Sequence, residues 1–386
     1  MCSPKPFITT INTRGALYNP PINETNYPRF TRGLLCLVYV TTALPAQFPK
    51  PRGAYFNRKQ GLMLLAAATI LIGFIVLIWS ADLFVTGAAS IAKNMGMSPI
   101  IIGLTIVSLG TSAPEILVSF TAALSGAGDL AIGNAIGSNI ANIGLVLGIT
   151  LLVAPMLVHK SCMKKEMPLL LLVTFGAGML LLDDVLSILD GWLMVGTLAL
   201  IIFHMVRTQQ QDEVLIGEAE EEHLKELSSL RAWVCFLVGL ALLVASSRLL
   251  VWGSVVIAES MGVSELVIGL TIVAVGTSLP ELAATIASAL RGHTEIALGN
   301  VIGSNMFNLL AVMSIPGIVG AESLEHAVIT RDYPTMTFLT VFLALAILVS
   351  RKRSASVDGR AYIGRTLGVL LVSFYALYYY WLYLSI

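Results

Sequence analysis

Two short motifs in this chain combine hydroxyl, proline and carboxylate residues in the same order. They read GTSAPE at 110–115 and GTSLPE at 276–281. Each proline removes a backbone donor and clashes with the preceding helical turn, so we expect a helix to break there. Each threonine precedes its glutamate by four residues, which places both side chains on one helical face if helicity resumes. Each break therefore carries two hydroxyls and one carboxylate: Thr111, Ser112 and Glu115, then Thr277, Ser278 and Glu281.

A second pair of motifs follows the first at a constant distance. It reads GNAIGSNIAN at 133–142 and GNVIGSNMFN at 299–308. Polar residues recur every four positions and form a stripe along one helical face: Asn134, Ser138 and Asn142, matched by Asn300, Ser304 and Asn308. Glycines four residues apart, Gly133 with Gly137 and Gly299 with Gly303, predict the close approach of another helix. Tight packing explains the glycines but does not require the asparagines.

Together the motifs offer carboxylate, amide, hydroxyl and backbone oxygens, with no thiol or imidazole nearby. Such all-oxygen sites suit hard cations such as Ca²⁺ and Na⁺. Carboxylates within a membrane are expensive, at roughly 3 kcal/mol each on insertion scales, and are functional by default. Two of them in one site would repel each other until a Ca²⁺ ion, several Na⁺ ions or protons neutralised them. If the empty site is too costly to occlude, obligatory exchange of one ion for another follows.

The composition places the chain in the membrane class. Hydrophobic residues make up 56% of the 386 positions and charged residues 12%, with a mean hydropathy of +0.84. The four cysteines and five histidines show no metal-ligand spacing, and no nucleophile is paired with a base. We therefore expect no bound cofactor, no enzymatic activity and no nucleic-acid partner. The expected surroundings are a lipid bilayer, and the sequence indicates no particular protein partner.

Ten apolar stretches are each near the length that crosses a bilayer. They cover 63–92, 99–124, 130–156, 167–182, 186–207, 232–258, 265–290, 296–320, 334–350 and 363–384. At an offset of 166 positions, 21 of the 40 residues from 103 to 142 are identical to those from 269 to 308. Five spans in each copy force the second copy to enter the membrane in the opposite sense. The sequence thus predicts an all-α membrane protein of ten helices in two inverted five-helix repeats, discontinuous in spans two and seven, an arrangement typical of secondary transporters.

The connectors predict domain limits and orientation. Residues 63–207 and 232–386 form the two repeats, and 208–231 form an acidic linker. Thirteen basic residues lie in the connectors after the odd-numbered spans and one lies on the other side, so the linker is expected in the cytoplasm and the C-terminus outside. A plasma membrane is the expected location.

Residues 1–62 are expected to form a poorly structured extension. They hold eight basic residues and one acid and lack helical periodicity. We interpret them as an artefact of an upstream start codon, with initiation at Met63, and leave open a processed presequence or a functional extension. Elsewhere, Asp82 and Arg248 occupy equivalent repeat positions, and we expect them to form a pair with a structural role, with gating as the alternative.

The paired GTS.PE and GN.IGSN..N motifs resemble those of the calcium/cation antiporter superfamily, the sodium/calcium exchangers, and in particular its short YrbG-type prokaryotic members. The resemblance covers about 63–386. It implies a ten-helix exchanger whose ion ligands come from both repeats: Thr111, Ser112, Glu115, Ser138 and Asn142 with Thr277, Ser278, Glu281, Ser304 and Asn308. It also implies Ca²⁺ chiefly on Glu115 and Glu281, with Na⁺ sharing those acids and the hydroxyls.

One departure concerns Asn308, which stands where potassium-dependent relatives carry Asp. An amide offers one oxygen and no charge, which disfavours K⁺ co-transport.

The leading interpretation is a Ca²⁺ antiporter driven by Na⁺. A proton-coupled cation exchanger is the alternative within transport, and a cation channel or an intramembrane enzyme are alternatives from other classes. Discontinuous helices in inverted repeats favour an antiporter over a channel. The lack of a paired nucleophile disfavours an enzyme.

Overall fold

The computed structural model describes residues 10–11, 17–18, 55–159, 162–209, 227–262, 274–320, 322–353 and 360–384. The chain divides into two compact units, Met1–Asn57 and Arg58–Ile386. In the first unit, strands β1 (Thr10–Ile11) and β2 (Leu17–Tyr18) pair antiparallel. Everything below concerns the second unit, in which the residues of the two predicted repeats are called the first and second halves.

Long apolar runs form helices in both halves, as the hydrophobic pattern predicts. The first half contains α2 (Tyr55–Met95), α3 (Pro99–Ile102), π-helix η1 (Gly103–Val107), α4 (Ser108–Thr111), α5 (Ala113–Leu124), α6 (Gly128–Ala141), η2 (Asn142–Leu147), α7 (Gly148–Val153), β3 (Met156–Val158), η3 (Cys162–Glu166), α8 (Met167–Leu180), β4 (Val185–Leu186) and α9 (Ile188–Gln209). The second half contains α11 (Ser229–Ser260), α13 (Ala274–Thr277), α14 (Leu279–Leu290), α15 (Thr294–Phe307), η5 (Asn308–Val312), α16 (Ser314–Val319), β5 (Glu322–Ser323), η6 (Val328–Asp332), α17 (Tyr333–Arg353), β6 (Ala361–Ile363) and α18 (Arg365–Leu384).

Seven segments of the described chain are long and apolar enough to cross a membrane, or eight if the bent pair Pro99–Thr111 and Ala113–Leu124 counts as one span. The protein is therefore an integral, multi-pass membrane protein. Two of the ten predicted spans are shorter than expected where described. The span 167–182 corresponds to the 14-residue α8, and only the 12-residue α14 and the short α13 represent the span 265–290, because 263–273 lie outside the described residues. Ten crossings therefore stay a prediction.

The duplication is visible in the local structure. The π-helical segments η2 and η5 begin at the equivalent residues Asn142 and Asn308, and η3 and η6 cover equivalent stretches. Inserted π-turns are frequent at functional sites, so their recurrence at the same motif position is informative.

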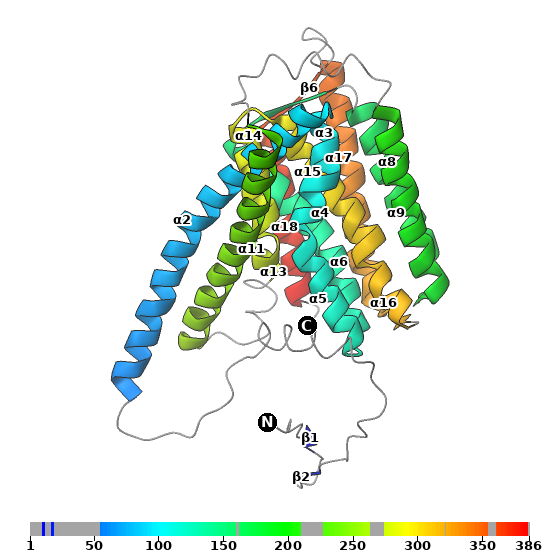
Figure 1. Cartoon of the computed structure of the whole chain (residues 1–386). Helices are drawn as coiled ribbons and strands as arrows, with labels where there is room; N and C mark the ends of the chain where they lie inside the picture. The colour runs from blue at the N-terminus through cyan, green and yellow to red at the C-terminus, as the bar shows by residue number, and fades with distance from the viewer. Residues whose placement is uncertain are drawn as a thin grey trace, which may run out of the picture. The chain divides into compact units, whose positions relative to one another are not determined.

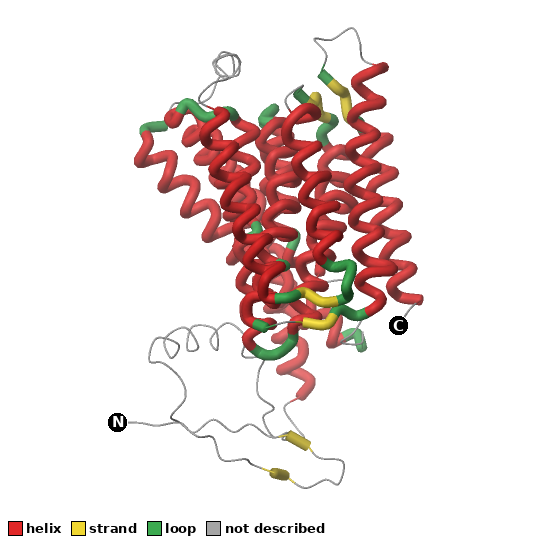
Figure 2. The backbone as a smooth tube through the Cα atoms, turned by 90° about the vertical axis from the view of Figure 1, so that its right-hand side faces the viewer, coloured by secondary structure: helices red, strands yellow, loops and turns green. Residues whose placement is uncertain are grey.

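The two halves also make reciprocal contacts. Strand β3 of the first half pairs with β6 of the second, and β4 of the first half pairs with β5 of the second, both antiparallel. The equivalent residues Asn139 and Asn305 touch each other, since Asn139 Nδ2 donates to the Asn305 carbonyl at 3.2 Å. Figure 1 shows the related helices α5 and α14 at opposite ends of the helical unit, with α4 and α13 between them. Figure 2 shows the helices from the side.

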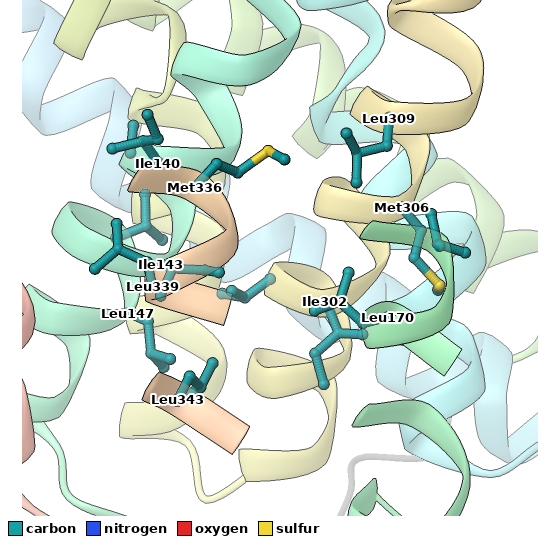
Figure 3. Close-up of a cluster of buried hydrophobic side chains, with 14 of the residues drawn as sticks. Ile140, Ile143, Leu147, Leu170, Ile302, Met306, Leu309, Met336, Leu339 and Leu343 are labelled. Carbon is teal, nitrogen blue, oxygen red and sulfur yellow. The ribbon is translucent and has the colours of Figure 1, made fainter. Parts of the chain in front are cut away.

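The core lies around the helices that carry the GN.IGSN..N motifs. In the apolar 18-residue stretch of Thr294–Val319, 94% of the residues are buried, and in that of Gly128–Val153, 72% are buried, whereas the corresponding stretch of Gly61–Met95 has 17%. Large aliphatic side chains from α6, η2, α8, α15, η5 and α17 fill the space between them (Figure 3). Among these are Ile140, Ile143, Leu170, Ile302, Leu309 and Leu339, each 1% exposed or less. These packed side chains hold the motif helices against α8 and α17.

Helices α2 and α11 pack against each other through glycines. A Cβ atom added at Gly87 would lie 2.4 Å from the Phe236 backbone nitrogen, and one at Gly239 would lie 2.6 Å from that of Phe84. In each contacting pair the two residue numbers add up to 323. A constant sum means that one helix runs antiparallel to the other in a fixed register. The equivalent glycines Gly253 and Gly73 meet Ile70 and Leu250 in the same register.

This register overturns the predicted pairing of Asp82 with Arg248. It places Asp82 opposite position 241 and Arg248 opposite position 75, about seven residues or ~10 Å apart along the helices. Asp82 instead accepts a hydrogen bond from Arg291 Nε at 2.6 Å, and the two side chains form an ion pair. Residues at equivalent positions of the two repeats can face each other only near the middle of this antiparallel helix pair. Asp82 lies away from that point.

Candidate ion site

Both acidic motifs interrupt their helices at the same residue. Helix α4 ends at Thr111 and α5 begins at Ala113, while Ser112 between them has φ −82° and ψ 2°. In the second half, Ser278 separates α13 from α14 with φ −87° and ψ 4°. The axes before and after Ser112 differ by 46°. Each proline lies in the first turn after the break, where its missing N–H costs no intrahelical bond. The breaks predicted within spans two and seven are therefore present.

The two glutamates lie in the first turns of the helices that follow these breaks. Glu115 is 1% exposed and Glu281 is 2% exposed. Among the described residues, Glu115 Oε2 and both Glu281 carboxylate oxygens have no hydrogen-bond partner. Glu281 is close enough to Glu115 for their charges to interact, and it lies near the hydroxyls of Thr111 and Ser112. The N-terminal ends of α5 and α14 favour negative charge there through the helix dipole.

The asparagines that end the second motifs lie where the halves cross. Helix α14 packs against η2, which begins with Asn142, and α5 packs against η5, which begins with Asn308. Both asparagines are 1% exposed. Both amide atoms of Asn142 and Oδ1 of Asn308 lack a hydrogen-bond partner from any residue that the structure describes. Each glutamate-bearing helix thus packs on the asparagine-bearing segment of the other half.

Thr111 joins the two halves directly. Its hydroxyl donates to Asn300 Oδ1 at 3.1 Å and lies 3.5 Å from Ser304 Oγ. It is also 3.3 Å from the Ser108 carbonyl one turn earlier on its own helix. Thr111 and Ser304, predicted as ligands from different halves, therefore meet in the protein interior.

All ten predicted ligands lie among the described residues. Nine of them are buried, and Thr277 is half-buried. The contacts above bring together Thr111, Ser112, Glu115, Glu281 and Ser304. The remaining predicted ligands, Ser138, Asn142, Thr277, Ser278 and Asn308, lie on the helices that carry or cross these residues. Across the described residues, no group of three or more His, Cys, Asp or Glu side chains could hold a metal ion, so neutral oxygens must complete any cation site on the glutamates.

The sequence interpretation missed two hydroxyl residues beside this group. Asn134 Nδ2 donates to Ser119 Oγ at 3.1 Å and to the Glu115 carbonyl at 3.2 Å. In the second half, Asn300 Nδ2 donates to Thr285 Oγ1 at 2.9 Å. A signal was present, because Ser119 and Thr285 are equivalent positions and each follows its glutamate by four residues on the same helical face.

The predicted close packing at the motif glycines is confirmed for the second half and stays a prediction for the first. Cβ atoms added at Gly299 and Gly303 would lie 2.6 Å from the Ile100 carbonyl oxygen and 2.5 Å from that of Leu104. A Cβ atom added at Gly133 or Gly137 would meet no heavy atom of a described residue within 4 Å. The partner of Gly299 and Gly303 is the segment 99–107, and its equivalent, 265–273, lies outside the described residues.

Comparison with known proteins agrees with this architecture. Residues 65–207 and 231–384 match the family described as "Sodium/calcium exchanger protein". The chain is 40% identical to the inner membrane protein YrbG of Escherichia coli over 288 residues, which is 73% of this chain and 89% of YrbG. It is 29% identical to the sodium/calcium exchanger MaX1 of Methanosarcina acetivorans over 351 residues, covering 79% of this chain and 95% of MaX1.

Among solved structures, the sodium-calcium exchanger NCX_Mj is similar, with a TM-score of 0.68 and 31% identity, covering 82% of this chain and 97% of that one. These matches extend over both halves and include both pairs of motifs. They support a Ca²⁺/cation antiporter as the class of transporter. The chain therefore belongs to the sodium/calcium exchanger protein family.

Proposed function

We propose that the protein is a secondary active antiporter that exchanges Ca²⁺ for Na⁺ across a membrane by alternating access. One observation carries the proposal. Two buried glutamates, Glu115 and Glu281, lie in the first turns of the helices after two equivalent breaks, and three of their four carboxylate oxygens have no hydrogen-bond partner in the described part of the chain. Buried polar atoms are normally paired, so these oxygens call for an additional partner.

A cation is the partner that fits the chemistry. The atoms without partners include the hydroxyls of Ser112 and Ser278 and the amide oxygens of Asn142 and Asn308. Carboxylate, hydroxyl and amide oxygens are the ligands of hard cations. We assign the site to the ten predicted ligands, with Ca²⁺ chiefly on Glu115 and Glu281, and with Na⁺ sharing the glutamates and hydroxyls.

The two carboxylates also supply the coupling. Because both are buried within the membrane segments, closing the site while both are charged and unoccupied would be costly. Occupation by Ca²⁺ or by Na⁺ removes that cost. Access therefore alternates only with one ion type or the other in place, which makes the movements of the two ions obligatorily coupled.

The proposal includes ten helices in two inverted five-helix repeats. It is supported by the opposite placement of α5 and α14 (Figure 1), the reciprocal strand pairs, and the contact between the equivalent residues Asn139 and Asn305. From the distribution of basic residues, we propose a plasma-membrane protein with the linker 208–231 in the cytoplasm and the C-terminus outside.

The test is ⁴⁵Ca²⁺ uptake into vesicles that contain the purified protein, with an imposed Na⁺ gradient, an imposed pH gradient, or neither. We expect uptake that depends on the Na⁺ gradient. Uptake that follows only the pH gradient would indicate proton coupling, and uptake indifferent to both would indicate a channel.

The site is tested by Glu115→Gln and Glu281→Gln, with Glu259→Gln as the control. Glu259 is an exposed glutamate near the end of α11. The first two variants should lose exchange and the control should retain it. Exchange that survives both site substitutions would refute the assignment.

A further inference from the structure

A buried hydrogen-bond chain runs from Thr285 through Asn300 to Thr111. Asn300 Nδ2 donates to Thr285 Oγ1 at 2.9 Å, and Thr111 Oγ1 donates to Asn300 Oδ1 at 3.1 Å. The three side chains are 0–1% exposed. They lie on α14, α15 and α4, so the chain connects the two halves. Thr285 and Asn300 are outside the proposed set of ligands.

We propose that Thr285 and Asn300 are positioning residues that turn the Thr111 hydroxyl so that its oxygen lone pairs face the transported cation. This inference rests on the proposed function, because it assumes that Thr111 is a ligand. It adds two residues and a reason for the orientation of a hydroxyl in the site.

The chemistry follows from what each group can donate and accept. A hydroxyl that coordinates a cation must offer a lone pair, so its hydrogen must point to an acceptor elsewhere. Asn300 Oδ1 is such an acceptor. Other acceptors also lie near this hydroxyl. They are the Ser108 carbonyl at 3.3 Å, along the helix of Thr111, Ser304 Oγ at 3.5 Å, and the Glu281 carboxylate of the site itself.

Thr285 decides which end of the Asn300 amide faces Thr111. The amide nitrogen can only donate and the amide oxygen can only accept. While Thr285 Oγ1 accepts from Nδ2, Oδ1 stays turned towards Thr111. Without that acceptor the amide is free to rotate, and its NH₂ group would then meet the Thr111 hydroxyl.

The first half repeats part of this arrangement. Asn134 is equivalent to Asn300, and its Nδ2 donates to Ser119, the residue equivalent to Thr285. Asn134 Nδ2 also donates to the Glu115 carbonyl. In both halves, the hydroxyl four residues after the glutamate accepts a hydrogen bond from the amide nitrogen of the equivalent asparagine. The arrangement therefore belongs to the duplicated unit and is not particular to one crossing.

The test compares Thr285→Val with Thr285→Ser in the full-length protein in vesicles. Valine has nearly the shape of threonine but cannot accept a hydrogen bond, whereas serine can. We expect Thr285→Val to raise the apparent KM for Ca²⁺ about three- to tenfold, the range for one hydrogen bond, with maximal uptake changed less than about twofold. Thr285→Ser should keep the original KM. Equal KM values for the two variants would overturn the inference.

A double-mutant cycle with Thr111→Val separates positioning from general packing. If Thr285 acts through the Thr111 hydroxyl, Thr285→Val has no further effect on KM once that hydroxyl is absent. The same rise in KM in both backgrounds would overturn the inference. The Ca²⁺-induced rise in Tm of each variant provides a second readout that does not depend on transport, and it should fall in Thr285→Val but not in Thr285→Ser.

The outcomes also separate this inference from the proposed function. If Glu281→Gln retains exchange, the proposed site is wrong. If Glu281→Gln loses exchange while Thr285→Val is unchanged in KM and in its Ca²⁺-induced Tm shift, only the role of Thr285 and Asn300 is wrong.

Discussion

The crossing of α15 with the segment 99–107 predicts a large effect of Gly299→Ala. The added Cβ would lie 2.6 Å from the Ile100 carbonyl oxygen and 3.1 Å from the Gly103 Cα. Both are main-chain atoms, so no side-chain rotation can make room. The two segments must move apart.

The displacement can be worked out from these distances. Ordinary contact begins at 3.4 Å, so the segments must separate by about 0.8 Å in a closely packed interior. Asn300 follows Gly299 on α15, and a separation of that size would lengthen its 3.1 Å bond with Thr111 to about 3.9 Å, which is no longer a hydrogen bond. Overpacking of this kind costs about 1–3 kcal/mol. We therefore expect a lower Tm and a higher KM for Ca²⁺.

The duplication provides a matched control in Gly133→Ala. Gly133 is the equivalent glycine and is exposed, and an added Cβ there would meet no heavy atom of a described residue within 4 Å. Replacing glycine by alanine in a helix otherwise stabilises it by about 0.5–1 kcal/mol, so this variant should be unchanged or slightly more stable. Thermal unfolding in detergent and ⁴⁵Ca²⁺ uptake measure both variants. Equal behaviour of the two would refute the reasoning from the close crossing.

Two further predictions concern other parts of the fold. Gly239→Ala should lower the Tm, because the added Cβ would lie 2.6 Å from the Phe84 backbone nitrogen. Gly196→Ala is the control and should not lower the Tm, because its added Cβ would meet no heavy atom of a described residue within 4 Å. Equal Tm values for the two variants would contradict the close packing of α2 on α11. Burial, with neighbouring carboxylates adding to it, raises the pKa of the Cys162 thiol well above its usual range. At pH 7.5 the thiol should stay protonated and react with a maleimide more than about tenfold slower than an exposed cysteine introduced by Lys164→Cys, and similar rates would count against this.

The sequence predicts the features that have local causes. A proline interrupts a helix because of its own ring and its missing N–H, whatever surrounds it. The GTS.PE motifs therefore predicted where the interruptions at Ser112 and Ser278 lie. The burial of Glu115 and Glu281 follows from their place in apolar spans. The duplication could also be predicted, because aligning the sequence with itself is enough to detect it.

Features that depend on how helices cross could not be predicted. The pairing of Asp82 with Arg291 depends on the register of α2 against α11 and on where the turn after α14 lies. Neither is encoded in the spacing of charges along one helix. The contact of Gly299 with the Ile100 carbonyl likewise depends on where the segment 99–107 crosses α15.

The π-helical start at Asn142 and Asn308 is a third such feature. Nothing in the composition of these segments separates a π-turn from an α-helical continuation.

Helices α2 and α11 meet the two halves of the site unequally, although their contact with each other is symmetric. An added Cβ at Gly110 would meet Leu240, whereas one at the equivalent Gly276 would meet Val251. Phe74 is the residue equivalent to Leu240, so symmetric packing would place Phe74 against Gly276. Instead, Phe74 and Gly276 both line one cavity.

The alternating access proposed above requires a second arrangement in which the halves exchange roles. In such an arrangement Phe74 would pack onto Gly276, and Leu240 would no longer contact Gly110. Because the halves are duplicates, the new contacts would resemble those that are lost. The two arrangements would then differ little in packing free energy, so a small difference in ion affinity between them would be enough to select one.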